Sequence, residues 1–351
     1  MNLIHNTLSV CEHCYRHVDA CVYEQDSQIW IDKECPVHGE ATYLVESDAD
    51  FYLNYKYPKH ALGSYFIEVT NRCNLNCPHC YQQPNLSSTD PTIDEILNLI
   101  SKWPDDGKPV ALVGAEPTMR SDLNEVITAI QNMPGKQRSI MILTNGVHLA
   151  NFEYAKKFKD LKNVAWTFGL NHPDYQGIVV RNKQMNGISN LKRLEIPIKN
   201  VSYTLEDMTQ LEYCLNEIQE FGNNVCQQFR VRCGADIGRH PGGEKIFLSD
   251  LVKQTLKICK ENNWKVVEEY TLSNRAHFSL LINDLLVKII QWPDAKTLDL
   301  KEVQTEAIAD ILPGQPPSPL VHQVILRDGA INKGLPLHDT IPQEWIDNYG
   351  N

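Results

Sequence analysis

The sequence predicts an α/β fold whose central part is a partial (β/α)6 barrel. Six short apolar runs rich in β-formers recur between about residues 64 and 240, as expected for strands buried on both faces. Segments with helical periodicity lie between these runs. Because repeated strand–helix units imply right-handed crossovers, we expect the six strands to form one parallel sheet.

The expected elements follow one another in a regular order. A helix over 92–103 follows Asp90 and Pro91, and a helix over 122–133 follows Ser121; each opens with a residue type that caps helices. A further helix is expected over 248–264. The six expected strands are 64–69, 108–114, 138–146, 163–170, 196–205 and 225–232.

Three regions follow from these patterns. Residues 1–55 are polar and rich in Cys and His, a composition that cannot build its own apolar core without a staple, so we expect a metal-binding knuckle there. Residues 60–245 form the barrel. Residues 246–351, which include a Pro-rich loop near residue 315, are expected to form an α+β carboxyl-terminal extension that covers the barrel mouth.

Composition and charge exclude several classes of protein. The net charge of −11 argues against nucleic acid as a partner, because a phosphate backbone attracts basic surfaces. The start of the chain lacks the pattern of a secretory signal, and no apolar run has membrane-spanning length, so we expect a cytoplasmic protein. Eleven cysteines in such a chain indicate metal ligands in preference to disulfides.

The most informative cysteines directly follow the first expected strand. Cys73, Cys77 and Cys80 have the spacing CxxxCxxC, and ligands of open α/β sheets gather at the carboxyl ends of the strands. Three thiolates on a 4Fe-4S cluster leave one iron without a protein ligand, where a cofactor can bind. The alternative is a structural zinc site completed by His79.

The triplet and a second motif resemble those of the radical S-adenosylmethionine (SAM) superfamily. The run LVGAEPT, at 112–118, is similar to the family's Gly-Gly-Glu-Pro motif, whose backbone meets the SAM amino group. The resemblance implies that Gly114, Ala115 and Glu116 contact SAM, which the cluster cleaves to methionine and a 5′-deoxyadenosyl radical. Ala115 replaces the second glycine, so some freedom at positive φ is expected to be lost.

Further positions match the family in order along the chain. The resemblance implies that Ser202 and Arg232 touch the ribose or carboxylate of SAM; alternatively, they are polar residues that end strands. Gly169 stands where related enzymes often carry an acidic residue, and Asn171 is a candidate substitute. Cys233 follows Arg232 at a strand end expected to face the radical cavity, where a thiol would donate hydrogen or hold a methyl group; the alternative is a small residue without a role.

A second metal site is expected before the barrel. Cys11 and Cys14 form a CxxC pair, and Cys35 and His38 follow at a spacing that suits two knuckles closing on one tetrahedral zinc ion, or iron in a rubredoxin-like site. This knuckle before the triplet resembles the branch of the superfamily that holds tetraether lipid synthase and dihydro-hydroxymethylpterin methyltransferase. We expect Cys21 to be a small buried side chain, and His13 and His17 to lie at the surface.

The sequence thus predicts an enzyme that abstracts hydrogen from a small-molecule substrate. The resemblance favours methylation or C–C bond formation, with pterin or lipid as substrate classes, and implies an electron donor such as flavodoxin or ferredoxin. Two alternatives stay open. One is a radical SAM enzyme that modifies peptides or natural products, and the other is a non-catalytic Fe–S and zinc sensor or scaffold.

Overall fold

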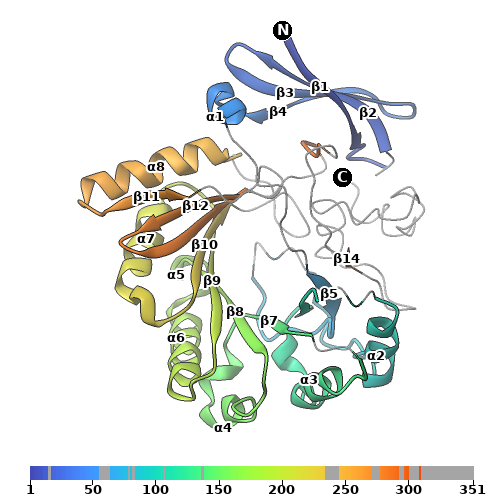
Figure 1. Ribbon diagram of the computed structural model, residues 1–351, viewed down its shortest axis with the longest axis vertical. Helices are drawn as coiled ribbons and strands as arrows, with labels where there is room; N and C mark the ends of the chain where they lie inside the picture. The colour runs from blue at the N-terminus through green and yellow to red at the C-terminus, as the bar shows by residue number, and fades with distance from the viewer. Residues whose placement is uncertain are drawn as a thin grey trace.

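The computed structural model describes two sheets joined along one chain (Figure 1). None of the described helices combines the length and apolar character needed to cross a membrane. The residues that the structure describes are 1–14, 17–54, 64–77, 80, 84–103, 105, 107–135, 138–233, 245–269, 277–291, 296–299 and 308–309.

The N-terminal sheet is a four-stranded antiparallel meander followed by a short helix. Its elements are β1 (Asn2–Val10), β2 (His17–Gln25), β3 (Gln28–Cys35), β4 (Gly39–Glu46) and α1 (Ala49–Asn54). This region has a small apolar core, because alternate residues of β2 and β3 point to one face. That core consists of Ala20, Val22, Ile29, Ile31, Ala49 and Tyr52.

The second sheet contains the six expected strands, paired in parallel and in sequence order. They are β5 (Tyr65–Glu68), β6 (Val110–Val113), β7 (Ile140–Thr144), β8 (Val164–Asn171), β9 (Ile198–Leu205) and β10 (Gln228–Cys233). The fold class predicted from the sequence is therefore confirmed.

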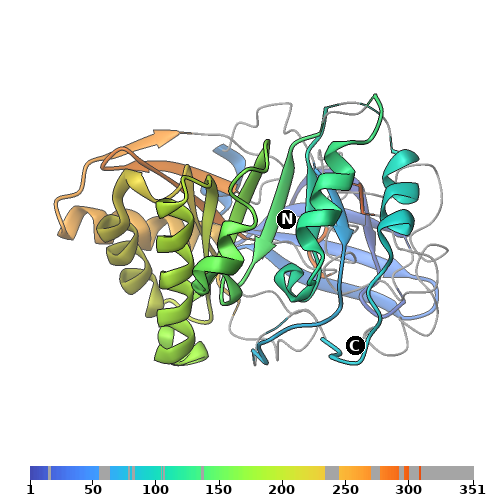
Figure 2. The same cartoon turned by 90° about the horizontal axis from the view of Figure 1, so that it is seen from below.

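Helices connect these strands and lie along the outside of the curved sheet. Figure 1 shows them around the lower and left sides, and Figure 2 shows them in front, with the N-terminal sheet behind. The connecting helices are α2 (Ile93–Ser101), η1 (Pro117–Met119), α3 (Leu123–Gln131), η2 (His148–Ala150), α4 (Phe152–Lys156), α5 (Pro173–Gln176), α6 (Ile178–Arg193), α7 (Gln210–Phe221) and η3 (Gly222–Asn224).

The two faces of the sheet differ in chemistry. Alternate residues such as Ile67, Leu112 and Trp166 belong to the large apolar core shared with the helices, and we call this the outer face. The residues between them, such as Thr167 and Asn200, point the other way and form the inner face of the barrel. These two side chains are hydrogen-bonded at 2.9 Å.

The carboxyl-terminal region lengthens the same sheet. Helix α8 (Leu248–Glu261) precedes β11 (Val266–Glu269), β12 (His277–Ile282) and β13 (Leu285–Ile290), and β13 pairs in parallel with β10. The short β14 (Ile308–Ala309) pairs with β5 at the opposite edge. Most of the extension expected to cover the barrel mouth lies outside the described residues, so that part of the prediction stays untested.

The N-terminal sheet is attached to this region by polar contacts. The buried Glu46 carboxylate accepts hydrogen bonds from the Ser249 hydroxyl at 2.6 Å and from the Ser249 backbone N–H at 3.3 Å, at the start of α8. Asp299 accepts a hydrogen bond from Thr7 and contacts the His5 ring, each at 2.7 Å. Both contacts join the N-terminal sheet to the carboxyl-terminal region.

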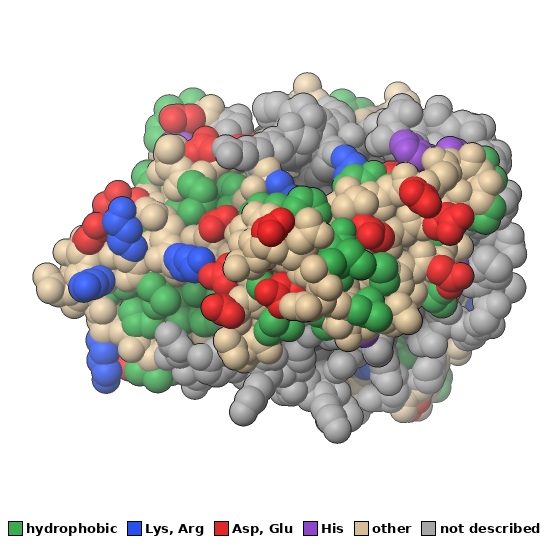
Figure 3. Space-filling view, turned by 90° about the horizontal axis from the view of Figure 1, so that it is seen from above, with side chains coloured by type: hydrophobic (Ala, Val, Ile, Leu, Met, Phe, Trp, Pro, Cys, Tyr) green, Lys and Arg blue, Asp and Glu red, His purple; other side chains and the backbone are tan. Residues whose placement is uncertain are grey.

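Acidic side chains dominate the exposed surface of the N-terminal sheet. Figure 3, seen from that side of the molecule, shows them spread over the face. Lys33 is the single lysine or arginine within 1–14 and 17–54, and it is buried. A phosphate backbone would be repelled here, in keeping with the net charge of the chain.

Candidate metal centres and the inner face of the barrel

Two turns of the N-terminal sheet bring four metal-binding side chains together. Cys11 and Cys14 lie in the turn between β1 and β2, Cys35 is the last residue of β3, and His38 lies in the turn between β3 and β4. Their sulfur and nitrogen ligand atoms all lie within 4.8 Å of one another. The spacing of these residues in the sequence predicted the same four ligands for one metal ion.

The distances within this cluster fit one tetrahedral ion. The sulfur atoms of Cys14 and Cys35 are 3.8 Å apart, and His38 Nδ1 is 3.5 Å from the sulfur atoms of both Cys11 and Cys35. With zinc–sulfur bonds of about 2.3 Å and zinc–nitrogen bonds of about 2.0 Å, tetrahedral edges are about 3.8 Å between sulfurs and about 3.5 Å between sulfur and nitrogen. The side chains are therefore already spaced as ligands of a single metal.

The surroundings of the cluster also favour a thiolate. Burial alone would raise the pKa of Cys35, but backbone N–H groups of Val37 and His38, with the His38 ring, lower that pKa to about 6. Burial raises the pKa of Cys11 to about 12. The N–H groups that point at Cys35 are the donors that a metal-bound thiolate needs.

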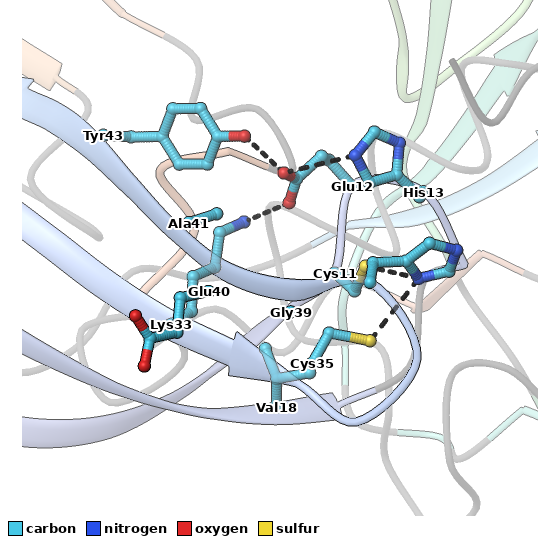
Figure 4. A pocket seen from close by; sticks show the side chains of 11 residues that line it. Cys11, Glu12, His13, Val18, Lys33, Cys35, Gly39, Glu40, Ala41 and Tyr43 are labelled. Atoms are coloured by element: carbon cyan, nitrogen blue, oxygen red, sulfur yellow. Dashed lines mark hydrogen bonds and ion pairs between the residues drawn. The ribbon is translucent and has the colours of Figure 1, made fainter.

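A buried ion pair supports the first turn (Figure 4). Lys33 Nζ lies 2.8 Å from the Glu12 carboxylate and donates a hydrogen bond of 2.9 Å to the carbonyl oxygen of Val10. The Tyr43 hydroxyl donates to the same carboxylate. These contacts fix Val10 and Glu12 on both sides of Cys11, and they were not predicted because nothing in the local sequence links Lys33 to this turn.

Three side chains near the cluster test smaller expectations. His13 is exposed, as expected. His17 is half-buried, contrary to the expectation of a surface residue, and burial lowers its pKa. Cys21 is half-buried, less enclosed than expected, because it lies on β2 opposite Asp32 of β3.

The central cysteine triplet lies in a loop at the carboxyl end of β5. The loop is closed by a backbone hydrogen bond from Asn85 to Asn71 at 2.8 Å, and the backbone N–H of Cys80 donates to the carbonyl oxygen of Cys77 at 3.2 Å. His79, the alternative zinc ligand, lies outside the described residues.

Cys73 is half-buried in this loop. Burial raises its pKa to about 12, and the nearby Glu116 carboxylate and the other two thiols raise it further, whereas the Leu75 backbone N–H opposes the shift. That N–H lies 3.3 Å from the Cys73 sulfur, and the Asn145 amide nitrogen lies 3.8 Å from it. Asn145, which follows β7, thus contacts Cys73, a candidate ligand of the cluster.

The turn after β6 depends on one glycine. Gly114 has φ of +138°, and a Cβ atom there would lie 2.2 Å from the backbone oxygen of Thr70. Ala115 does not have positive φ, so the backbone conformation at this position does not need the freedom that a second glycine would give. The backbone N–H groups of Ala115 and Glu116 donate to the carbonyl oxygens of Thr70 and Arg72, each at 3.0 Å, which ties this turn to the cysteine loop.

The Glu116 side chain joins the turn to the end of β7. Its buried carboxylate accepts hydrogen bonds from the Thr118 hydroxyl and the Thr144 hydroxyl, each at 2.6 Å, and from the Asn145 backbone N–H at 2.6 Å. A fourth donor is the Thr118 backbone N–H at 3.0 Å. The carboxylate is therefore engaged within the protein, and the SAM contact expected from the sequence stays a prediction.

Two arginines, Arg72 and Arg120, support the cysteine loop through contacts with neighbouring segments, and the sequence analysis did not predict them. Arg72 pairs with Asp90, whose carboxylate also accepts a hydrogen bond of 2.6 Å from Thr70. The buried Arg120 donates to the carbonyl oxygens of Val69 and Pro91, at 2.8 and 2.7 Å. Arg72 directly precedes Cys73, which was the available clue.

Strand alternation separates the other candidate residues. Ser202 and Arg232 lie on the inner face, and Arg232 Nε donates to the Thr204 hydroxyl at 2.9 Å. Tyr203 is fully buried on the outer face and donates a hydrogen bond of 2.6 Å to Glu217 of α7. Only Ser202 of these two neighbours points inward.

Cys233 is also on the outer face, contrary to the expectation that it faces the radical cavity. It belongs to the apolar core with Val231, and burial raises its pKa to about 12, with a contribution from Asp250 of α8. On β8, Gly169 and Asn171 share the inner face with Ser202, so Asn171 remains a candidate substitute for the missing acidic residue.

Comparison with known families matches two segments of the chain. Residues 67–204 match the radical SAM superfamily, and residues 3–47 match the HMPTM N-terminal zinc ribbon domain. The fold is similar to that of Streptococcus suis SuiB, solved bound to S-adenosylmethionine, with a TM-score of 0.50 and 13% identity over 81% of this chain and 71% of that one.

Two curated relatives extend the comparison. A 7,8-dihydro-6-hydroxymethylpterin dimethyltransferase of Methanocaldococcus jannaschii is 31% identical over 214 residues, which are 51% of this chain and 42% of the relative. A probable GTP 3′,8-cyclase of Methanococcus aeolicus is 26% identical over 65% of this chain and 76% of the relative. The chain thus spans less than half of the first relative, and its two matched segments are a radical SAM domain and an N-terminal zinc ribbon domain.

Proposed function

We propose that this protein cleaves SAM reductively at a 4Fe-4S cluster and uses the resulting 5′-deoxyadenosyl radical to abstract hydrogen from a small molecule. The observation that carries the proposal is the position of Cys73, Cys77 and Cys80 at the carboxyl end of β5, where backbone and side-chain contacts link their loop to the ends of β6 and β7. Three cysteines leave one cluster iron for SAM.

The residues around the loop have separate roles in this proposal. The backbone N–H groups of Ala115 and Glu116 are engaged, which leaves the carbonyl oxygens of Gly114 and Ala115 to accept hydrogen bonds from the SAM amino group. Ser202 and Arg232, on the inner face, bind the ribose or carboxylate of SAM. Glu116 keeps the turn and the end of β7 in register.

The N-terminal cluster is proposed as a structural zinc site. Cys11, Cys14, Cys35 and His38 supply four ligands at tetrahedral spacing, so no position is left for a substrate. The metal supplies a covalent link between the β1–β2 and β3–β4 turns. A one-electron donor such as flavodoxin or ferredoxin is expected to serve the other site.

Methylation or C–C bond formation is the proposed class of reaction. The pterin dimethyltransferase and the GTP cyclase that resemble this chain are both named for substrates with fused nitrogen-containing rings. We therefore favour a reduced pterin or a related heterocycle over a lipid.

The test is anaerobic reconstitution of the full chain with iron and sulfide, followed by reduction in the presence of SAM. Chromatography should detect 5′-deoxyadenosine with the wild type and none with Cys77→Ala. Cys21→Ser is the matched control, since Cys21 lies on β2 away from both clusters of ligands. It should form the same amount of product as the wild type.

Metal analysis distinguishes the outcomes. Cys77→Ala should lose iron and keep zinc, whereas Cys35→Ala should lose zinc. A wild-type protein that holds a complete cluster and SAM, yet forms no 5′-deoxyadenosine with any reductant, would support the non-catalytic alternative instead.

A further inference from the structure

A row of cationic and polar side chains crosses the inner face beside the proposed SAM site. Arg230 of β10 lies opposite Ser202 of β9 on one side and opposite Lys288 of β13 on the other. Residues at the same register on neighbouring strands point to the same face. Lys288 and Arg230 therefore lie side by side on the inner face. Arg230 precedes Arg232 by two residues on β10, so this pair is farther from the carboxyl ends of the strands.

A β-bulge adds a third cation to this row. Trp166 pairs with Ile198 but the next residue, Thr167, pairs with Asn200, so Lys199 is an extra residue in β9. Bulges redirect side chains out of simple alternation. Because Lys199 is the extra residue, it can share the inner face with its neighbour Asn200, and its charge acts on both Arg230 and Lys288.

The three cations are partly enclosed and lie close together. Burial lowers the pKa of Lys199 and of Lys288; Arg230 lowers both further, and Lys199 adds to the effect on Lys288. Within the described part of the chain, neither lysine ammonium forms an ion pair or a hydrogen bond. Like charges brought together in a half-buried position disfavour folding unless an anion joins them.

SAM itself is a poor match for this group of charges. Its sulfonium and ammonium groups outweigh its one carboxylate, so the molecule carries a net positive charge. Arg232, one register nearer the carboxyl ends, already offers a partner for that carboxylate. The charge on the lower row therefore suits a second molecule.

We propose that Lys199, Arg230 and Lys288 bind an anionic group, phosphate or carboxylate, of the substrate. The inference deepens the proposed function and rests on it, because it places the substrate on the inner face beside SAM. Ser202, which is the register partner of Arg230, lies between this group of charges and the proposed SAM site. The substrate class is then a small molecule with at least one oxyanion.

The test measures anion binding without turnover. Calorimetric titration of the full reconstituted chain with pyrophosphate, and separately with succinate, distinguishes phosphate from carboxylate recognition. Lys199→Gln and Lys288→Gln should each weaken binding about tenfold or more, because each removes a charge-assisted hydrogen bond. Lys257→Gln, on the exposed side of α8, should bind as the wild type does.

Three controls keep the result interpretable. Lys288→Arg retains the charge and should retain binding, which separates charge from misfolding. Saturating SAM should not displace the anion. Equal binding by all variants, no binding of either anion, or displacement by SAM would each overturn the proposal. Because no 5′-deoxyadenosine is measured, failure here is distinct from failure of SAM cleavage.

Discussion

The two cysteine sites differ in how much of the metal's coordination the chain supplies. At the N-terminal sheet, two tight turns provide four ligands at the spacing of a single tetrahedral ion. At the barrel, one loop provides three thiols, and the surrounding strands supply backbone contacts in place of a fourth ligand. A site with four protein ligands suits a structural metal, whereas a site with three leaves one iron free to bind a cofactor for catalysis.

The source of rigidity differs as well. The cysteine loop of the barrel is held by the ends of β6 and β7 and by Arg72 and Arg120, all backed by the large apolar core. The N-terminal turns have a small core and one buried ion pair behind them. Metal loss should therefore affect the N-terminal sheet far more than cluster loss affects the barrel.

Removal of the N-terminal metal is expected to have the largest effect. Structural zinc contributes about 10 kcal/mol or more to the folding of small zinc domains, and the six-residue core behind these turns cannot replace it. Cys35→Ala, or a strong chelator, should expose β1–β4 to hydrogen exchange while the barrel strands stay protected. Cys21→Ala should keep zinc and protection. If β1–β4 were equally protected from hydrogen exchange with and without metal, the N-terminal sheet would not depend on its metal more than the barrel depends on its cluster.

The substitution Gly114→Ala should have the next largest effect on stability, and it tests the rigidity of the barrel site. Positive φ and overlap with the Thr70 carbonyl together cost about 3 kcal/mol or more in the free energy of unfolding. Gly107→Ala is the matched control, because its φ is also positive but nothing lies within 4 Å of an added Cβ. Denaturant unfolding should show the larger loss for Gly114, together with reduced iron loading. Equal losses would mean that the turn can shift.

The barrel could be predicted from the sequence because its signals are local. Each of the six strands is a short apolar run, and the cysteine spacing and the 112–118 motif are contiguous. The ligand set of the N-terminal sheet was predicted from spacing, but its strands were not, because polar and apolar residues mix along β1 and β4.

What the sequence could not show depends on long-range register. Cys233 was expected to face the cavity because Arg232 precedes it, yet neighbouring residues of a strand point to opposite faces. The bulge at Lys199 and the pairing of β13 with β10 align Lys288 with Arg230, although 58 positions separate them in the numbering. The hydrogen bonds from Thr144 and Asn145 to Glu116 likewise could not be predicted, because they join residues that are far apart in the sequence.

Glu116→Gln should have an intermediate effect and tests whether Glu116 positions the turn. The carboxylate accepts four hydrogen bonds, and an amide nitrogen in its place would face donors, at a cost of about 2 kcal/mol. Unfolding of the iron-free protein should reveal this loss before any cofactor binds. Glu125→Gln, exposed on α3, is the control. A variant with unchanged stability but weaker SAM binding would instead assign Glu116 to SAM.

The smallest expected effect concerns the contact that joins the two regions. Burial raises the pKa of Glu46, although hydrogen bonds from Ser249 and Ser47 oppose the shift. A carboxyl with a raised folded pKa binds more protons folded than unfolded, so its contribution to stability is present below the ordinary Glu pKa and is lost as pH rises through the folded pKa. Glu46→Gln stays neutral and keeps the acceptor at the start of α8. Its melting temperature relative to wild type should rise by roughly 1–2 °C across that pH range. Melting curves of both proteins measured from acid to neutral pH, with zinc retained, test this, and parallel curves would show that the carboxyl titrates alike in the folded and unfolded chains.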